Sequence, residues 1–301
     1  MTQHAWPIRL AQHVTLSINY TVKMKKLTLS FALAALLLAG CNNDNKEFTT
    51  RSINATQCYL LSYDEQMGPW GDTLGLKKVL EVEWPAKGFL SAAAERELMM
   101  LCFDDSTSAN VDKAVAAWLA KPYIYTDDGE APHVKTVDTL DESREYSYMA
   151  VRCNTTHDSV LATFNVGIET FGAGAAHGIY SSHTLTVDLE SGNVVSLTDL
   201  VSDTNQLCEA IARAIFDLDA NKDIRECLFD DYRNADRMPM PASFFIDSAR
   251  NNITVSYDLY HIQPYACGIP SVVLPIFWLS KHVELTPYAK RLFGPDSYIK
   301  E

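Results

Sequence analysis

The sequence has no Cys-x-x-Cys pair, although seven cysteines are present among its 301 residues. It also has no His-Glu-x-x-His motif and no Gly-x-Ser-x-Gly motif. The first absence argues against a zinc cluster, the second against a zinc peptidase and the third against a hydrolase with a serine nucleophile elbow. The apolar run at 27–39 is shorter than the roughly 20 residues that a membrane-spanning helix needs. The sequence therefore lacks the most recognisable signs of metal, serine-hydrolase and membrane-spanning proteins.

Positive charge is scarce after the first 40 residues. The chain has 25 Lys and Arg residues against 38 Asp and Glu residues, and four basic but no acidic residues lie in 1–40. Residues 41–301 thus hold 21 basic and 38 acidic side chains, a net charge of −17. This charge argues against nucleic acid or an anionic lipid surface as a partner and favours a cationic one. The alternative is an acidic surface that simply keeps the protein soluble.

The N-terminal part has the order of a secretory signal. Lys25 and Lys26 form a basic start, 27–39 is an uncharged apolar run, and small residues precede Cys41. The sequence Leu-Ala-Gly-Cys at 38–41 resembles a lipobox, at which a lipoprotein is cleaved after its cysteine is acylated. We therefore predict cleavage before Cys41 and a lipid anchor on it, against the alternatives of an ordinary secreted protein or a buried helix.

This interpretation divides the first part of the chain into three segments. Met24 fits a natural start, so we expect residues 1–23 to be a misassigned extension and 24–40 to be the lipoprotein signal peptide. Residues 41–57 would be the lipidated cysteine and a flexible tether, because they are polar and lack apolar periodicity. Asn42 stands where enteric lipoproteins of the inner membrane carry Asp. The expected location is therefore the cell envelope at the outer membrane, facing the periplasm or the surface.

Six cysteines remain after Cys41, an even number that permits disulfides in an exported chain with 15 connectivities. Our first hypothesis pairs Cys208 with Cys227, which flank one predicted helix and its exit loop. Buried free thiols are the alternative. The six are Cys58, Cys102, Cys153, Cys208, Cys227 and Cys267.

Residues 58–145 are predicted to form a smaller α+β region. The stretch 76–84 alternates as a strand does, and Ser91 and Asn110 are typical caps for two helices with apolar stripes. Residues 127–143 are polar and acidic, which indicates a loop.

Residues 146–301 are richer in strands. Strand-like segments cover 146–153, 158–171, 177–189, 243–247, 252–260 and 271–277, and Ser191-Gly192-Asn193 indicates a turn. Asp203 or Thr204 should cap a helix with an apolar stripe from Leu207 to Leu218, and Thr286-Pro287 should begin a final one that ends at Gly294. Strands here are not separated by regular helices, so the expected class is α+β, a mostly antiparallel sheet with packed helices.

Three motifs resemble ligand sites but fail on detail. The glycines of 172–178 are followed by strand-like residues rather than by the helix that a nucleotide loop opens, so a bend is expected there. The segment 217–223 lacks the glycine of a calcium loop, and Leu228 stands where its bidentate Glu belongs, so we read it as a solvated helix end. His177 and His183 would lie about 20 Å apart on a strand, too far to share a metal. No cofactor and no metal are predicted.

The most unusual local pattern is 257–270, reading YDLYHIQPYACGIP. Its prolines and glycine favour a compact bend between two strands, with Tyr260 and Tyr265 as anchors of the bend. A structural role and a ligand-facing loop both remain open.

Two segments carry a resemblance to a known family. Residues 177–200, HGIYSSHTLTVDLESGNVVSLTDL, and 260–275, YHIQPYACGIPSVVLP, resemble the paired motifs of the RsiV-like C-terminal domain, which also occurs in the peptidoglycan deacetylase PdaC. The region before it, roughly 76–150, is similar to the smaller domain that usually precedes it. This chain departs from the family pattern at His261, where an acidic residue is usual, and in reading GAAHG rather than GGAHG.

The resemblance implies an α+β fold for 146–301, recognition of c-type lysozyme outside the membrane, and a link to cell-wall glycan. We therefore expect a non-enzymatic binding module on a lipid anchor, with a cationic protein such as lysozyme or peptidoglycan as partner. A glycan-directed hydrolase with paired carboxylates, or a purely structural envelope lipoprotein, are the alternatives. The residues we single out for a binding or structural loop are His177, Gly178, Tyr260, His261, Tyr265 and Gly268.

Overall fold

A computed structural model describes residues 47–62, 73–122, 132–141, 146–247, 249 and 251–295. The predicted extension, the signal peptide and the lipidation site at Cys41 lie outside the described residues. The chain from Lys46 to Glu301 forms one compact unit. None of the helices in the described ranges combines the length and the apolar character that crossing a membrane requires.

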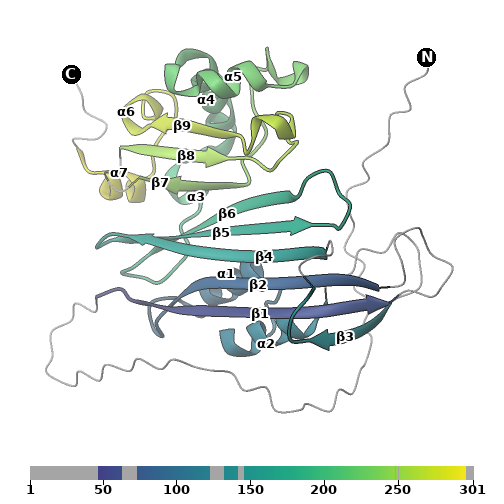
Figure 1. Ribbon diagram of the computed structural model, residues 1–301. Helices are drawn as coiled ribbons and strands as arrows, with labels where there is room; N and C mark the ends of the chain where they lie inside the picture. The colour runs from purple at the N-terminus through teal and green to yellow at the C-terminus, as the bar shows by residue number, and fades with distance from the viewer. Residues whose placement is uncertain are drawn as a thin grey trace, which may run out of the picture. The chain divides into compact units, whose positions relative to one another are not determined.

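Six strands form one sheet in the order β3-β1-β2-β4-β5-β6 (Figure 1). Neighbouring strands are antiparallel except β2 and β4, which run parallel. Parallel neighbours need a long crossover connection, and here it contains two helices and the edge strand β3. The strands are β1 (Thr50–Ser62), β2 (Thr73–Pro85), β3 (His133–Val137), β4 (Tyr146–His157), β5 (Leu161–Phe171) and β6 (Ile179–Asp188).

The two crossover helices, α1 (Ala92–Phe103) and α2 (Val111–Ala120), begin where the sequence predicts. The Ser91 hydroxyl accepts from the Ala94 amide at 3.2 Å, and the Asn110 side chain accepts from the Lys113 amide at 3.0 Å. Each cap satisfies an amide that the first helical turn leaves without a partner, a contribution of about 1 kcal/mol.

One hydrophobic cluster joins both helices to the sheet. Leu98 of α1 packs in the same cluster as Leu80 of β2 and Phe164 of β5, and all three side chains are fully buried. Burial of each such side chain contributes about 1.5–3 kcal/mol. Figure 1 shows α1 and α2 beside strands β1 to β4.

A second, three-stranded antiparallel sheet, β7-β8-β9, follows in the chain. Helix α4 (Thr204–Asp217) packs on it through Ile211 and Ile215, and Asp203 caps the helix by accepting from the Asn205 amide at 2.8 Å. The strands are β7 (Ser243–Ile246), β8 (Asn252–Ser256) and β9 (Ser271–Pro275), and the other helices are α3 (Leu197–Leu200), α5 (Lys222–Cys227), α6 (Ile276–Leu279), α7 (Pro287–Phe293) and the single-turn helices η1 (Asp219–Asn221), η2 (Asp230–Tyr232) and η3 (Tyr265–Cys267).

The segment 217–223 is not simply a solvated helix end, because Asn221 is buried to 2 % exposure. Its amide donates to the carbonyls of Ala214 and Val273 at 2.9 and 3.0 Å, and it accepts from the Val273 amide at 2.8 Å. Asn221 thus fastens the end of α4 to β9 with three hydrogen bonds in the core.

Two predicted segments differ from the structure. Strand β1 begins at Thr50, so residues 50–57, which we assigned to a flexible tether, are paired with β2. Strand β3 lies within 127–143, which we predicted as a loop. Both strands are polar over most of their length and are held by pairing to residues far away in the sequence, so no local periodicity marks them.

The predicted boundary between 58–145 and 146–301 runs through the six-stranded sheet. Strand β4 from the second range pairs along eight residues with β2 from the first, from Gly75 opposite Tyr146 to Val82 opposite Cys153. A further link joins the two sheets, since the Thr184 hydroxyl on β6 donates to the Phe244 carbonyl on β7.

Candidate functional site

The unusual segment 257–270 forms the connection between β8 and β9, and its base is closed by hydrogen bonds. The amide of Tyr257 donates to the Pro270 carbonyl at 2.9 Å, and the buried Tyr257 hydroxyl donates to the Pro239 carbonyl at 3.0 Å. Pro264 precedes the helical turn η3, and Gly268 ends it with a φ of 79°, a conformation that glycine adopts without strain. The tyrosine that anchors the bend in the core is therefore Tyr257, whereas Tyr260 is exposed.

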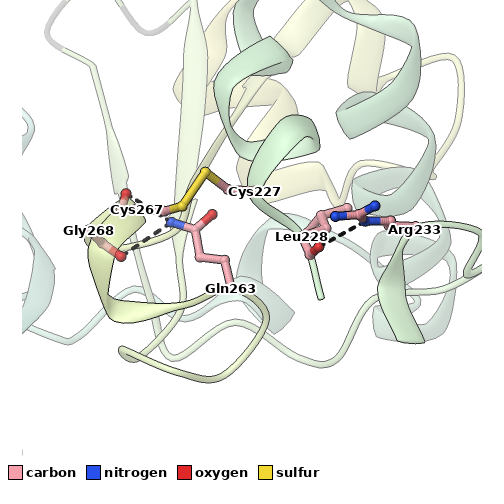
Figure 2. Close-up of a disulfide and its surroundings, with 6 residues drawn as sticks. All are labelled: Cys227, Leu228, Arg233, Gln263, Cys267 and Gly268. Atoms are coloured by element: carbon pink, nitrogen blue, oxygen red, sulfur yellow. Dashed lines mark hydrogen bonds between the residues drawn. A yellow bond between two sulfur atoms is a disulfide. The ribbon is translucent and has the colours of Figure 1, made fainter. Parts of the chain in front are cut away.

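A disulfide between Cys227 and Cys267 ties this connection to the end of α5 (Figure 2). Our hypothesis of a Cys208–Cys227 bond is wrong. Cys208 is buried on α4 with its sulfur 4.0 Å from that of Met240, whereas Cys227 faces the β8–β9 connection. Closeness in sequence favoured Cys208, but only the tertiary fold brings the two bonded cysteines together.

The buried side-chain amide of Gln263 stabilises the turn η3. The side chain of Gln263, only 3 % exposed, donates to the carbonyls of Cys267 and Gly268 at 3.1 and 3.2 Å. Figure 2 shows Gln263 beside the disulfide, pointing toward these two carbonyls. The turn that carries Tyr265 is thus fixed from inside by a covalent bond and by two hydrogen bonds.

Tyr265 brings the two conspicuous sequence motifs together. Its ring stacks on His177, with centroids 4.4 Å apart and planes inclined by 20°, and on Tyr260 at 5.8 Å and 28°. Its hydroxyl donates to the Gly178 carbonyl at 2.8 Å. We call His177, Tyr260 and Tyr265 the aromatic stack.

The aromatic stack is open to solvent. The Tyr260 side chain is 49 % exposed, His177 is exposed, and Ile179, the residue after Gly178, is 61 % exposed. Tyr260 also has a φ of 64°. This left-handed backbone conformation is strained for a residue other than glycine, and such strained residues cluster at functional sites. Binding hot spots are enriched in tyrosine, so this exposed group of rings is a candidate contact surface.

The remaining predicted residues support the stack rather than extend it. His261 makes an edge-on contact with the buried Tyr257 at 5.6 Å, and its amide donates to the Asp258 carbonyl at 3.1 Å. Gly268 is a turn residue. The structure therefore brings His177, Gly178, Tyr260 and Tyr265 into direct contact, and places His261 and Gly268 in the turn that carries them.

A second polar feature, absent from our sequence predictions, lies on the six-stranded sheet. Arg152 of β4 donates from Nε to Glu81 of β2 at 3.0 Å and from a terminal nitrogen to Glu169 of β5 at 3.1 Å. Two adjoining hollows, about 370 and 160 Å³ in volume, share Arg152 and Asn154 as lining residues. We call this surface the polar sheet face. Its other lining residues are Ser52, Asn54, Glu81, Val82, Glu83, Cys153, Asn165, Gly167, Tyr180 and Ser182.

Two carboxyl groups among the described residues have clear pKa shifts, and both shifts are downward. Hydrogen bonds from Ser108 and Thr107 lower the pKa of Asp105 to about 2. Burial raises the pKa of Asp188, but hydrogen bonds from Ser191 and Tyr288 outweigh it and hold that pKa below its ordinary value. A glycosidase of the usual type needs one carboxyl whose pKa is raised.

Among the residues that the structure describes, no three His, Cys, Asp or Glu side chains cluster in a way that would hold a metal ion. His177 and His183, the pair of histidines closest in sequence within residues 41–301, have different surroundings. His177 belongs to the aromatic stack, and His183 lies on β6 opposite Val166.

No protein-family model and no curated protein matches this chain. Two solved structures of DUF3298 family proteins are similar in fold. The one from Bacteroides fragilis has a TM-score of 0.52 and 17% identity, covering 80% of this chain and 94% of its own. The one from Pseudomonas aeruginosa has a TM-score of 0.48 and 15% identity, covering 81% of this chain and 97% of its own. The first of these likenesses supports the α+β fold, which our sequence analysis predicted.

Proposed function

We propose that this protein is a non-enzymatic binding module of the cell envelope, anchored by lipid on Cys41, and that the aromatic stack is its contact surface. The observation that carries this proposal is Tyr265, whose ring stacks on His177 and Tyr260 while its hydroxyl bonds to Gly178. Aromatic anchors held rigid before binding lose little conformational entropy on association.

The proposed partner is a cationic protein such as c-type lysozyme. The charge of −17 for residues 41–301 raises the rate of encounter with a cationic partner. Exposed tyrosine faces also attract the guanidinium and ammonium groups that such a partner carries. The RsiV-like resemblance of 177–200 and 260–275 supports the same partner, because those two segments supply all three residues of the aromatic stack.

Cell-wall glycan is a second candidate, favoured by the polar sheet face. That surface combines amide, hydroxyl and carboxylate groups with the half-exposed ring of Tyr180. Arg152 is paired with two carboxylates, Glu81 and Glu169, which leaves this group with a net negative charge. The surface therefore suits a hydroxyl-rich ligand better than an anion.

Calorimetry tests the proposed partner directly. Purified residues 42–301 are titrated with c-type lysozyme at low and at physiological salt. We expect saturable 1:1 binding that persists at physiological salt. Tyr260→Ala should raise the Kd at least about 30-fold, as the loss of a hot-spot aromatic does.

The control is Met100→Ala on α1, a change to a side chain of similar exposure, 47 % against 49 %. It should leave the Kd unchanged. Binding that disappears at physiological salt would indicate unspecific charge attraction, and equal effects of both variants would remove the aromatic stack from the proposal. Binding of peptidoglycan fragments without binding of lysozyme would favour the glycan candidate.

A further inference from the structure

Two buried cysteines that belong to no disulfide in the structure lie on neighbouring elements of one hydrophobic cluster. Cys102 on α1 and Cys153 on β4 are 1 % and 3 % exposed and are members of the same hydrophobic cluster. The helix approaches the strand closely, with Cα atoms of the two elements within 8 Å. The Cys153 side chain lies close enough to the Cys102 thiol to raise its pKa, together with burial.

The other two free cysteines among the described residues have different surroundings. Cys58 lies on β1, opposite Lys77 of β2 and Val137 of β3, and Cys208 lies on α4 beside Met240. Of these four thiols, only Cys102 and Cys153 share a hydrophobic cluster. A disulfide requires two cysteines on elements that approach closely, with Cα atoms about 4.4–6.8 Å apart. The close approach of α1 to β4 makes this pair the candidate.

We propose that Cys102 and Cys153 form a second disulfide in the mature protein, besides Cys227–Cys267. The proposal rests on the proposed location in the envelope, because disulfides form and persist in oxidising compartments. The bond would join α1 covalently to β4, across the crossover that connects β2 with β4. Cross-linking residues about 50 positions apart restricts the unfolded chain strongly.

The oxidant is a disulfide-bearing compound, either a thiol oxidase or oxidised glutathione. One cysteine thiolate attacks the oxidant and forms a mixed disulfide, and the second cysteine displaces the oxidant as a thiol. One S–S bond breaks in the oxidant and one forms in the protein, while two electrons and two protons pass to the two oxidant sulfurs. Both thiols are buried in the folded protein and out of reach of the oxidant, so this exchange takes place before the core closes.

The test supplies the oxidant directly. Reduced, denatured residues 42–301, which include the whole compact unit, are refolded in a buffer of reduced and oxidised glutathione. Free thiols are then alkylated under denaturing conditions and counted by intact mass, and a non-reducing digest identifies the linked peptides. Six cysteines are present in this segment, so two disulfides leave two alkylated thiols, on Cys58 and Cys208.

Four alkylated thiols after refolding, or a peptide that links Cys102 to any cysteine other than Cys153, would overturn the proposal. Cys102→Ala should leave three alkylated thiols, with the additional one on Cys153. The count needs no variant, so it stands even if Cys102→Ala fails to fold. The same count on protein isolated from cells tests the location separately. Two alkylated thiols in both samples support it, whereas two after refolding but neither disulfide in the protein from cells would contradict the envelope location.

Discussion

Tyr265 and His177, which come from the β8–β9 connection and the segment before β6, lie stacked with their ring centroids 4.4 Å apart. The hydroxyl of the same tyrosine donates a hydrogen bond to the carbonyl of Gly178, the residue after His177. The contact joins the small sheet to the large one at a point where both side chains remain accessible. A contact that only stabilises the fold would not need to be exposed. Because the aromatic stack is exposed, we test it as a binding surface.

Replacement of Tyr265 separates the two roles of this side chain. Tyr265→Phe keeps the stack and loses the hydrogen bond to Gly178, so it should lower the free energy of unfolding by about 0.5–1.5 kcal/mol and leave partner binding nearly unchanged. Tyr265→Ala should in addition weaken binding at least about 30-fold. Urea unfolding and calorimetry measure the two effects. Equal binding by wild type and Tyr265→Ala would contradict the proposed contact surface.

Removal of the Cys227–Cys267 disulfide should destabilise the protein. The bond spans 40 residues, and by loop-closure entropy its loss in the double variant Cys227→Ala, Cys267→Ala should lower the free energy of unfolding by about 3–4 kcal/mol. Denaturant unfolding under non-reducing conditions measures this change. Cys208→Ala is the control for the pairing, because the Cys227–Cys267 link should persist in its peptide map. A Cys208–Cys227 peptide in the wild type would contradict the structure.

Lys78 makes stability depend on pH. Its ammonium is buried to 3 % exposure against the Trp118 ring and donates to the carbonyls of Trp118 and Lys121 at 2.5 and 2.8 Å. Burial, with the nearby charge of Lys121, lowers the pKa of Lys78 from 10.5 to about 7. The folded state therefore binds fewer protons than the unfolded state between these two values, and the stability contributed by this group rises with pH across that window.

Chemical denaturation at pH 7 and pH 9 checks this dependence, with Lys78→Met as the comparison. The variant should lose the part of the pH dependence that Lys78 causes. It should also be less stable at pH 9 by about 1–3 kcal/mol, because the carbonyls at the end of α2 lose their donor. The same change in stability from pH 7 to pH 9 in wild type and variant would exclude Lys78 as its source.

Gly192 should tolerate no side chain. It has a φ of 70°, and an added Cβ would lie 2.9 Å from the Ser91 nitrogen and 3.0 Å from the Phe89 oxygen, both of the backbone. Gly192→Ala should therefore lower the free energy of unfolding by about 1–3 kcal/mol. Gly172→Ala is the matched control, since its Cβ would meet nothing within 4 Å and should change stability by about 0.5 kcal/mol or less. Thermal or urea unfolding of both variants distinguishes them.

Local signals predicted much of the fold. Ser91, Asn110 and Asp203 cap helices as their residue types indicate, and Gly294 follows the last helix. The apolar residues from Leu207 to Ile215 lie in the core because their spacing places them on one face of α4. These features depend on neighbouring residues, so the sequence alone contains the information.

What the sequence did not predict depends on distant residues. The polar strands β1 and β3 exist through pairing, the partner of Cys227 is set by the path of the β8–β9 connection, and Asn221 is buried because β9 supplies its partners. No sequence pattern indicates the contact of His177 with Tyr265, because the two residues lie far apart in the chain. Our sequence analysis singled out both residues but not their contact. Arg152 gave no signal, because an arginine on a strand becomes informative only when Glu81 and Glu169 lie beside it.

The parallel pairing of β2 with β4 decides how the protein can be divided. A fragment that starts at residue 146 would keep β4, β5 and β6 but expose the full backbone edge of β4, a long strand with buried apolar residues such as Val151. Unprotected edges of this kind pair with other chains and aggregate. Residues 146–301 carry both family-like motifs, but on their own they should aggregate. They should remain soluble and monomeric only when β2 covers the edge of β4.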